Sequence, residues 1–328
     1  MDITLFSTCV ASAGLLPEVF RNRVTEVARW SEDHGCRGIL VYTDNSLVDP
    51  WLVAQTIIEQ TRSLIPLVAV QPVYMHPYTV AKMVSSLGHL YGRAVDLNMV
   101  AGGFVNDLRA LADTTPHDRR YDRLREYAGI VRQLLAGEVV TSAGEFCRVE
   151  RLRLTPALPA GLFPWILVSA SSPAGLAAAT ALDAVVVKYP APSESGVVDP
   201  APAGLRSGIR VGIIARKSEE DAWRAAYDRF PEDRRGQMVH ALAMRTSDSQ
   251  WHRELSDVDR ESAPYWLTPF RNGKTFCPYL VGSYERVGRE LARYVAARST
   301  TFILDIPAAE EDLHHARLAF EHAAVTVV

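Results

Sequence analysis

Eight short apolar runs, most of them followed by a stretch with helical spacing, dominate the pattern of the chain. They span residues 3–10, 38–42, 64–71, 94–100, 165–169, 184–188, 210–215 and 301–305. Runs this short with few polar positions are typical of strands in a parallel sheet that is covered on both faces. Strand and helix patterns that alternate this often predict an α/β fold, with the eight strands closed into a (β/α)8 TIM barrel.

Three segments break this alternation. Residues 137–156 alternate apolar and polar side chains around Gly144, which predicts a hairpin. Residues 189–208 are rich in Pro, Ser, Gly and Ala and carry no helical pattern. Residues 231–282 are long for a connection and too aromatic for a disordered segment. We therefore expect one domain, residues 1–328, with residues 231–282 as a lid-like insertion over the carboxyl-terminal mouth of the barrel.

Composition narrows the functional classes. The chain has 328 residues, 48% of them hydrophobic, and a formal net charge of −3 without a Lys/Arg-rich run. Such a chain offers no basic surface for a nucleic-acid backbone, so we expect no nucleic-acid partner. No apolar stretch reaches the length of a membrane span, and Asp2 stands where a signal peptide would carry positive charge. We expect a cytoplasmic protein without a membrane anchor.

The cysteines and the acidic–histidine cluster near the end of the chain do not indicate a metal site. The four cysteines are scattered singly, without the close pairs of metal sites or disulfide frameworks. Residues 310–315 contain two glutamates and two histidines, but on a surface helix these are typical of a solvated face. The sequence therefore predicts no metal ligand.

Polar motifs at the ends of two strands indicate a ligand site. Asn98 lies near the end of an apolar run that the glycines after it terminate, and ligands of α/β sheets bind at the carboxyl ends of strands. Ser171, Ser172 and Pro173 connect another strand to a helix. Hydroxyl residues and a proline there are typical of a helix start, whose N–H groups bind phosphate or are simply capped.

The order of three motifs resembles the bacterial-luciferase-like flavin-dependent monooxygenases, and among them most closely the alkanesulfonate monooxygenase branch. The motifs are Asn98-Met99-Val100-Ala101-Gly102, then His117 to Tyr121 at a helix start, then Ala170-Ser171-Ser172. The resemblance extends over nearly the whole chain. It implies a (β/α)8 barrel that binds FMN, with molecular oxygen as co-substrate.

The resemblance also implies roles for individual residues. The expected flavin-binding residues are Asn98, Ala101, His117, Tyr121, Ser171 and Ser172. The expected catalytic residues are Arg210 by its match to the sulfonate branch, Arg271 and Lys274 by a looser match, and His76 by its place after a strand. Asp44, Asn45 and Tyr74 are further polar residues near strand ends.

Other positions depart from the sulfonate branch. Gly212 and Leu47 stand where that branch has histidine and cysteine, and Ala101 replaces a threonine. Retained flavin positions with changed substrate positions predict a different small organic substrate, oxygenated in a biosynthetic pathway.

No dinucleotide-binding glycine motif is present, so a separate NAD(P)H:flavin reductase is expected to supply reduced FMN to a homodimer. The alternatives are a deazaflavin-dependent oxidoreductase and a non-catalytic flavin-binding protein.

Overall fold

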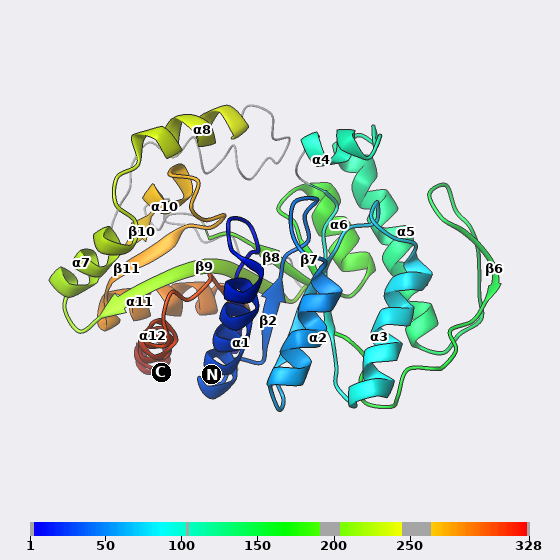
Figure 1. The fold of residues 1–328 in the computed structure, drawn as a ribbon, viewed down its shortest axis with the longest axis horizontal. Coiled ribbons are helices and arrows are strands. Elements are labelled where there is room, and N and C mark those ends of the chain that lie inside the picture. Colours follow the sequence, from blue (N-terminus) through cyan, green and yellow to red (C-terminus); the bar gives the residue numbers. More distant parts are fainter. Residues whose placement is uncertain (1–2, 103–104, 191–203, 245–263, 327–328) are drawn as a thin grey trace. The chain divides into compact units, whose positions relative to one another are not determined.

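The computed structural model describes residues 3–102, 105–190, 204–244 and 264–326 (Figure 1). The chain divides into two compact units. Unit 1 comprises residues 1–8, 33–36 and 187–328, and unit 2 comprises residues 9–32 and 37–186. Each unit is described by itself below.

The sheet of unit 2 consists of parallel strands that follow one another in chain order. These strands are β2 (Gly38–Val41), β3 (Ile65–Val70), β4 (Asp96–Met99), β7 (Ile166–Ser169) and β8 (Val185–Lys188). Nearly every side chain on them is buried, because helices cover the sheet. All five strands were predicted from the apolar runs, and their positions are confirmed to within a few residues.

Helices follow most of the unit 2 strands. They are α1 (Pro17–Asp33), α2 (Pro50–Gln60), α3 (Pro77–Tyr91), α4 (Val105–Ala110), α5 (His117–Leu135) and α6 (Pro173–Ala181). Helices α2, α3 and α6 begin with a proline behind a side-chain cap, which fixes where the chain leaves the strand end. The predicted hairpin is confirmed as the antiparallel pair β5 (Val140–Ala143) and β6 (Arg148–Leu152).

Unit 1 carries its own five strands. They are β1 (Thr4–Thr8), β9 (Ser207–Arg216), β10 (Tyr265–Trp266), β11 (Tyr279–Ser283) and β12 (Ser299–Leu304), in the order β10-β11-β9-β12-β1. Only β10 runs antiparallel to its neighbour among these described pairs. The helices are α7 (Glu219–Arg229), α8 (Arg234–Met244), α10 (Thr268–Arg271), α11 (Tyr284–Ala296) and α12 (Glu310–Thr326).

The carboxyl-terminal part of the predicted insertion is built into unit 1. Strand β11 lies parallel to β9, with Tyr279 opposite Gly212, and extends the sheet. Tyr265, Trp266 and Phe270 are at most 2% exposed. The aromatic residues of this segment are therefore mostly core residues, and their number gives no support to a lid. Residues 245–263 lie outside the described part, and a lid function for residues 231–282 stays a prediction.

The strand order defines the fold class. The eight parallel strands β1, β2, β3, β4, β7, β8, β9 and β12 follow chain order, and β9 pairs with both β8 and β12. This is the order of the (β/α)8 TIM barrel that the sequence predicts. Within the described ranges, no helix has the length and apolar character needed to cross a membrane.

Candidate active site

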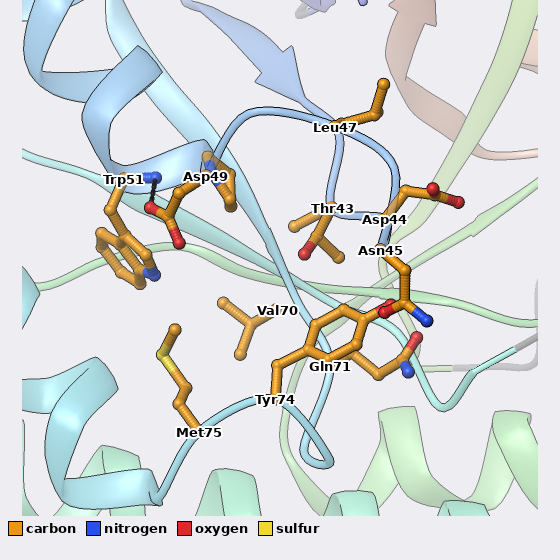
Figure 2. A pocket seen from close by; sticks show the side chains of 12 residues that line it. Thr43, Asp44, Asn45, Leu47, Asp49, Trp51, Val70, Gln71, Tyr74 and Met75 are labelled. Carbon is orange, nitrogen blue, oxygen red and sulfur yellow. Dashed lines mark hydrogen bonds between the residues drawn. The ribbon is translucent and has the colours of Figure 1, made fainter. Parts of the chain in front are cut away.

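A cavity of about 200 Å³ lies in unit 2 where strands β2 and β3 end (Figure 2). Twelve residues line it: Thr43, Asp44, Asn45, Leu47, Asp49, Pro50, Trp51, Ala69, Val70, Gln71, Tyr74 and Met75. Figure 2 shows Trp51 and Met75 on one side of the cavity and Asp44, Asn45 and Gln71 on the other. The cavity therefore combines an apolar wall with a polar one, which is the usual composition of a small-molecule site.

Asn98 lies next to this cavity. In the register of β3 and β4, Ala69, which lines the cavity, is the partner of Asn98. The Asn98 side chain is 5% exposed, and its Oδ1 accepts a hydrogen bond of 3.0 Å from Ser169 Oγ on β7. This bond fixes the amide, so that Nδ2 presents a donor at the carboxyl end of β4.

The start of helix α6 adjoins β7. Ser172 caps the helix, its Oγ accepting a 3.2 Å hydrogen bond from the Gly175 N–H, and the first turn carries no acidic residue. A Cβ atom at Gly175 would lie 2.4 Å from Ala170 Cβ and 3.0 Å from the Tyr121 ring. Only glycine permits so close an approach, so the helix start is packed tightly against both the strand exit and α5.

Helix α5 brings the third motif to the same place. Its first residue, His117, bonds Asp118 through Nδ1 at 2.8 Å, and its ring lies 5.4 Å from that of Tyr121. Tyr121 is 9% exposed, and its ring contacts the start of α6 as described above. Arg120, 2% exposed, donates a 2.5 Å hydrogen bond to the Gly102 carbonyl. This bond ties α5 to the turn that follows β4.

These residues fit a flavin monophosphate. The helix start has partial positive charge, Ser172 carries a hydroxyl, and no carboxylate of the first turn competes for the anion. Gly102 has a φ of 99°, a backbone conformation that favours glycine, and it leaves room beside the Gln71 amide. Ala101 is buried and has no hydroxyl to offer, so only its backbone could contact a ring.

Asp44, on the polar wall of the cavity, is in contact with a second carboxyl group, that of Asp107. Asp44 follows β2, and Asp107 lies on α4 and hydrogen-bonds to Asp44. Burial and, to a smaller extent, the neighbouring Asp44 carboxyl raise the pKa of Asp107. Burial, followed by the charges of Asp107 and Asp44, raises the pKa of Tyr74 to about 12. The phenol is therefore un-ionised at neutral pH and lies close to concentrated negative charge.

Of the predicted catalytic residues, only His76 belongs to unit 2. It is exposed, and its Nδ1 accepts the 3.2 Å capping bond from Tyr78 N at the start of α3. It does not line the cavity. Its geometry is explained by helix capping, and a role in proton transfer stays a prediction.

Arg210 lies on β9 in unit 1, in a buried polar cluster. Its guanidinium is 3.9 Å from Asp305 Oδ1 and 6.0 Å from the centre of the Tyr189 ring. Asp305 Oδ2 accepts a 2.8 Å hydrogen bond from Tyr279 Oη. Burial and then the Asp305 charge raise the pKa of Cys277 well above its usual value. This thiol is thus un-ionised and unreactive.

Arg271 and Lys274 also lie in unit 1. Arg271 ends α10, and Lys274 Nζ lies 3.0 Å from Asp233 Oδ2 in a half-exposed ion pair. A catalytic role for these two residues stays a prediction.

Three residues of unit 2 were missed by sequence reasoning. Gln71, Asp107 and Arg120 are part of the site region. Gln71 immediately follows β3, so its position at a strand end was a usable signal. Asp107 and Arg120 lie on helices, where a charged side chain is normally taken as solvated.

The fold places the protein among the (β/α)8 barrels, a class of proteins whose ligands bind at the carboxyl ends of the strands. The sequence matches the family of luciferase-like monooxygenases over residues 1–301, and the chain belongs to that family. A relative from Niallia circulans, the 4-(gamma-L-glutamylamino)butanoyl-[BtrI acyl-carrier protein] monooxygenase BtrO, is 35% identical over 309 residues. The match covers 90% of this chain and 89% of the relative.

Solved structures share the fold at low identity. The EDTA monooxygenase EmoA from Chelativorans sp. BNC1 has a TM-score of 0.72 and 15% identity, covering 100% of this chain and 95% of its own. An F420-dependent secondary alcohol dehydrogenase has a TM-score of 0.68 and 14% identity, and the match covers 98% of this chain and 99% of the dehydrogenase chain. These likenesses establish the barrel fold. Family membership and the BtrO relative together show that the protein is a flavin-dependent monooxygenase.

Proposed function

We propose that the protein is the oxygenase of a two-component system, which takes reduced FMN from a separate NAD(P)H:flavin reductase. It would use molecular oxygen to oxygenate a small organic substrate in a biosynthetic pathway. Family membership supports the reaction class. The need for a reductase is supported by the absence of a dinucleotide-binding glycine motif from the sequence.

The observation that carries the FMN assignment is the convergence of Asn98, Tyr121 and the start of α6 in unit 2. In the proposal, the phosphate binds at Ser171 and Ser172, where N–H groups and a hydroxyl meet an anion. His117 and Tyr121, whose rings are 5.4 Å apart, would lie along the ribityl chain. The Asn98 amide and the Ala101 backbone would contact the ring, and reduced FMN would supply the electrons that activate oxygen.

The protein's own contribution is to orient the substrate, stabilise charge and exclude water. Arg210 is proposed to stabilise negative charge that develops on oxygen, because a guanidinium that is mostly buried acts more strongly than one in water. His76 is proposed as a proton donor, and Arg271 and Lys274 as contacts to the substrate. These four assignments rest on position and on the resemblance.

The substrate is proposed to be an acyl group, either free or tethered to a carrier protein. BtrO, by its name, acts on an acyl group attached to an acyl-carrier protein, and it is 35% identical to this chain. We further propose a cytoplasmic homodimer. The four cysteines are free thiols, as in a reducing compartment, and Leu16 and Leu52 are large apolar side chains exposed on unit 2.

Binding of FMN, FAD and the deazaflavin F420 tests the cofactor. Fluorescence titration should show FMN binding more tightly than FAD, because one helix start accommodates a monophosphate and leaves no site for an adenosine half. Substrate-dependent oxygen consumption with an added FMN reductase should follow. Tighter binding of F420 without oxygen consumption would favour the deazaflavin alternative. FMN binding with no oxygen consumption for any acyl substrate would favour a non-catalytic flavin-binding protein.

A further inference from the structure

Asp44 and Asp107 bring two carboxyl groups into contact beside the unit 2 cavity. Asp44 lines the cavity and Asp107 contacts Asp44, and burial followed by repulsion from Asp44 raises the pKa of Asp107. None of the ion pairs between described residues involves either group. Two carboxyl groups in contact without a cation destabilise the fold at neutral pH. Placement of this kind is typical of groups kept for binding a ligand.

The loop holds the pair in place. Asp44 Oδ1 accepts a 2.8 Å hydrogen bond from Ser46 N, so the carboxylate is fixed relative to β2. Asn45 Nδ2 donates a 3.3 Å hydrogen bond to the Asp107 carbonyl, which joins the loop to α4. The negative charge is thus presented by a formed loop, without needing a rearrangement to meet a cation.

An independent observation comes from Gln71. Its side chain lines the same cavity and is 7% exposed, and its Nε2 makes no hydrogen bond of normal geometry with any described residue. The Gln71 amide also lies near the Tyr74 hydroxyl. It acts to lower the pKa of Tyr74, but this effect is smaller than those of burial, Asp107 and Asp44, which raise that pKa. A buried N–H donor left without a proper acceptor destabilises the folded protein. It is satisfied when a ligand supplies an oxygen.

The rest of the cavity suits a short hydrocarbon chain. Val70, Trp51 and Met75 form apolar lining, and Figure 2 places Trp51 and Met75 across the cavity from Asp44 and Gln71. Ala69, also in the lining, is the register partner of Asn98. A ligand in this cavity would therefore lie beside the residue that we assign to the flavin ring.

We propose that this cavity binds an aminoacyl substrate: Asp44, with Asp107 beside it, receives the protonated amino group, and Gln71 Nε2 donates to the acyl oxygen. The proposal rests on the proposed function, because it names the substrate class of the same monooxygenase. It does not depend on the cofactor or on the carrier. The substrate carries a cation at one end, an oxygen acceptor near Gln71 and methylene groups against the apolar wall.

A pair of small probes tests the charge requirement. The first is 4-aminobutanamide, which ends in an ammonium group, and the second is pentanamide, in which a methyl group replaces it. Ligand-observed NMR titration of the full chain, without flavin, should show the ammonium probe binding at least about tenfold more tightly. Equal affinities would overturn the proposal.

Substitutions assign the preference to residues. Asp44→Asn keeps the oxygen that accepts from Ser46 N but removes the charge, and it should abolish the preference while leaving pentanamide binding unchanged. Asp107→Asn should reduce the preference, and Gln71→Met should weaken both probes alike. Asp228→Asn, an exposed change on α7, is the charge-matched control and should have no effect. A preference that persists in both Asp44→Asn and Asp107→Asn would refute the assignment.

The outcomes separate this proposal from the proposed function, because probe binding requires neither flavin nor oxygen. A clear ammonium preference together with no oxygenation of any aminoacyl compound would contradict only the proposed function. Oxygenation of a neutral acyl substrate, with equal binding of both probes, would contradict only the aminoacyl assignment.

Discussion

Replacing Ser172 by alanine separates helix capping from phosphate binding. The Ser172 hydroxyl accepts a 3.2 Å hydrogen bond from Gly175 N at the start of α6. Ser283 makes the same bond, also of 3.2 Å, to Arg286 N at the start of α11 in the other unit. The two serines are therefore matched as caps, and only Ser172 belongs to the proposed phosphate site.

The magnitudes follow from the two roles. Loss of a serine cap costs about 1 kcal/mol, so either substitution should lower the melting temperature by about 2 °C in a chain of this size. A hydrogen bond to a charged phosphate contributes about 1.5–3 kcal/mol, which corresponds to a loss of about 10-fold to 150-fold in FMN affinity. Only Ser172→Ala should show that second loss.

Two measurements on three proteins decide whether Ser172 only caps the helix or also binds the phosphate. Thermal melts of the wild type, Ser172→Ala and Ser283→Ala measure the cap, and fluorescence titration with FMN measures the anchor. If Ser172→Ala and Ser283→Ala have the same small effect on the dissociation constant for FMN, Ser172 is only a helix cap. The phosphate assignment would then be wrong.

Three further predictions concern Glu32, Gly212 and the segment 231–282. Burial acts to raise the pKa of the Glu32 carboxyl, but hydrogen bonds from residues 62–64 outweigh burial and lower this pKa to about 2. Because the pKa in the unfolded chain is about 4.5, the ionised carboxylate stabilises the fold at pH values above 4.5. Glu32→Gln should lower the free energy of unfolding, measured with urea at pH 7, by about 2 kcal/mol. The difference from the wild type should shrink as the pH falls from about 4.5 towards 2. A difference that does not change with pH would contradict the ionic role. Gly212→Ala places a Cβ atom 2.3 Å from a β11 tyrosine ring and should destabilise the protein by at least about 2 kcal/mol; an unchanged melting temperature would show that β11 can move away. If residues 231–282 act as a lid, the double variant Arg271→Ala/Lys274→Ala should keep its FMN affinity while releasing more hydrogen peroxide per product, and unchanged peroxide release would refute the lid.

The eight barrel strands were predictable because each is a short apolar run with a clear end. Strand β4, for example, comprises Asp96–Met99, inside the predicted run, and the polar Asp96 is explained by Arg37 at 3.1 Å and by the Trp165 N–H. Strand β11 was missed because Tyr279–Ser283 follows a proline-containing aromatic segment with no alternation of its own. Its partner β9 lies far away in sequence, and such pairing leaves no local signal.

The candidate site was predictable only in part. Local motifs identified Asn98, Tyr121 and Ser172, because strand ends and helix starts have recognisable sequences. The contact of Asp44 with Asp107 joins a loop to a helix 63 positions away in the sequence, and no local pattern reveals it. The burial of Gln71 is a tertiary property as well.

The most direct test of the central claim is the fate of molecular oxygen. The protein is supplied with an FMN reductase, NAD(P)H and isotope-labelled dioxygen, together with a series of aminoacyl thioesters on a carrier protein, and the products are examined by mass spectrometry. The account predicts that one aminoacyl group gains a single labelled oxygen atom, only when reduced FMN is supplied. A product that lacks the label, or one formed with reduced F420 in the absence of oxygen, would contradict it.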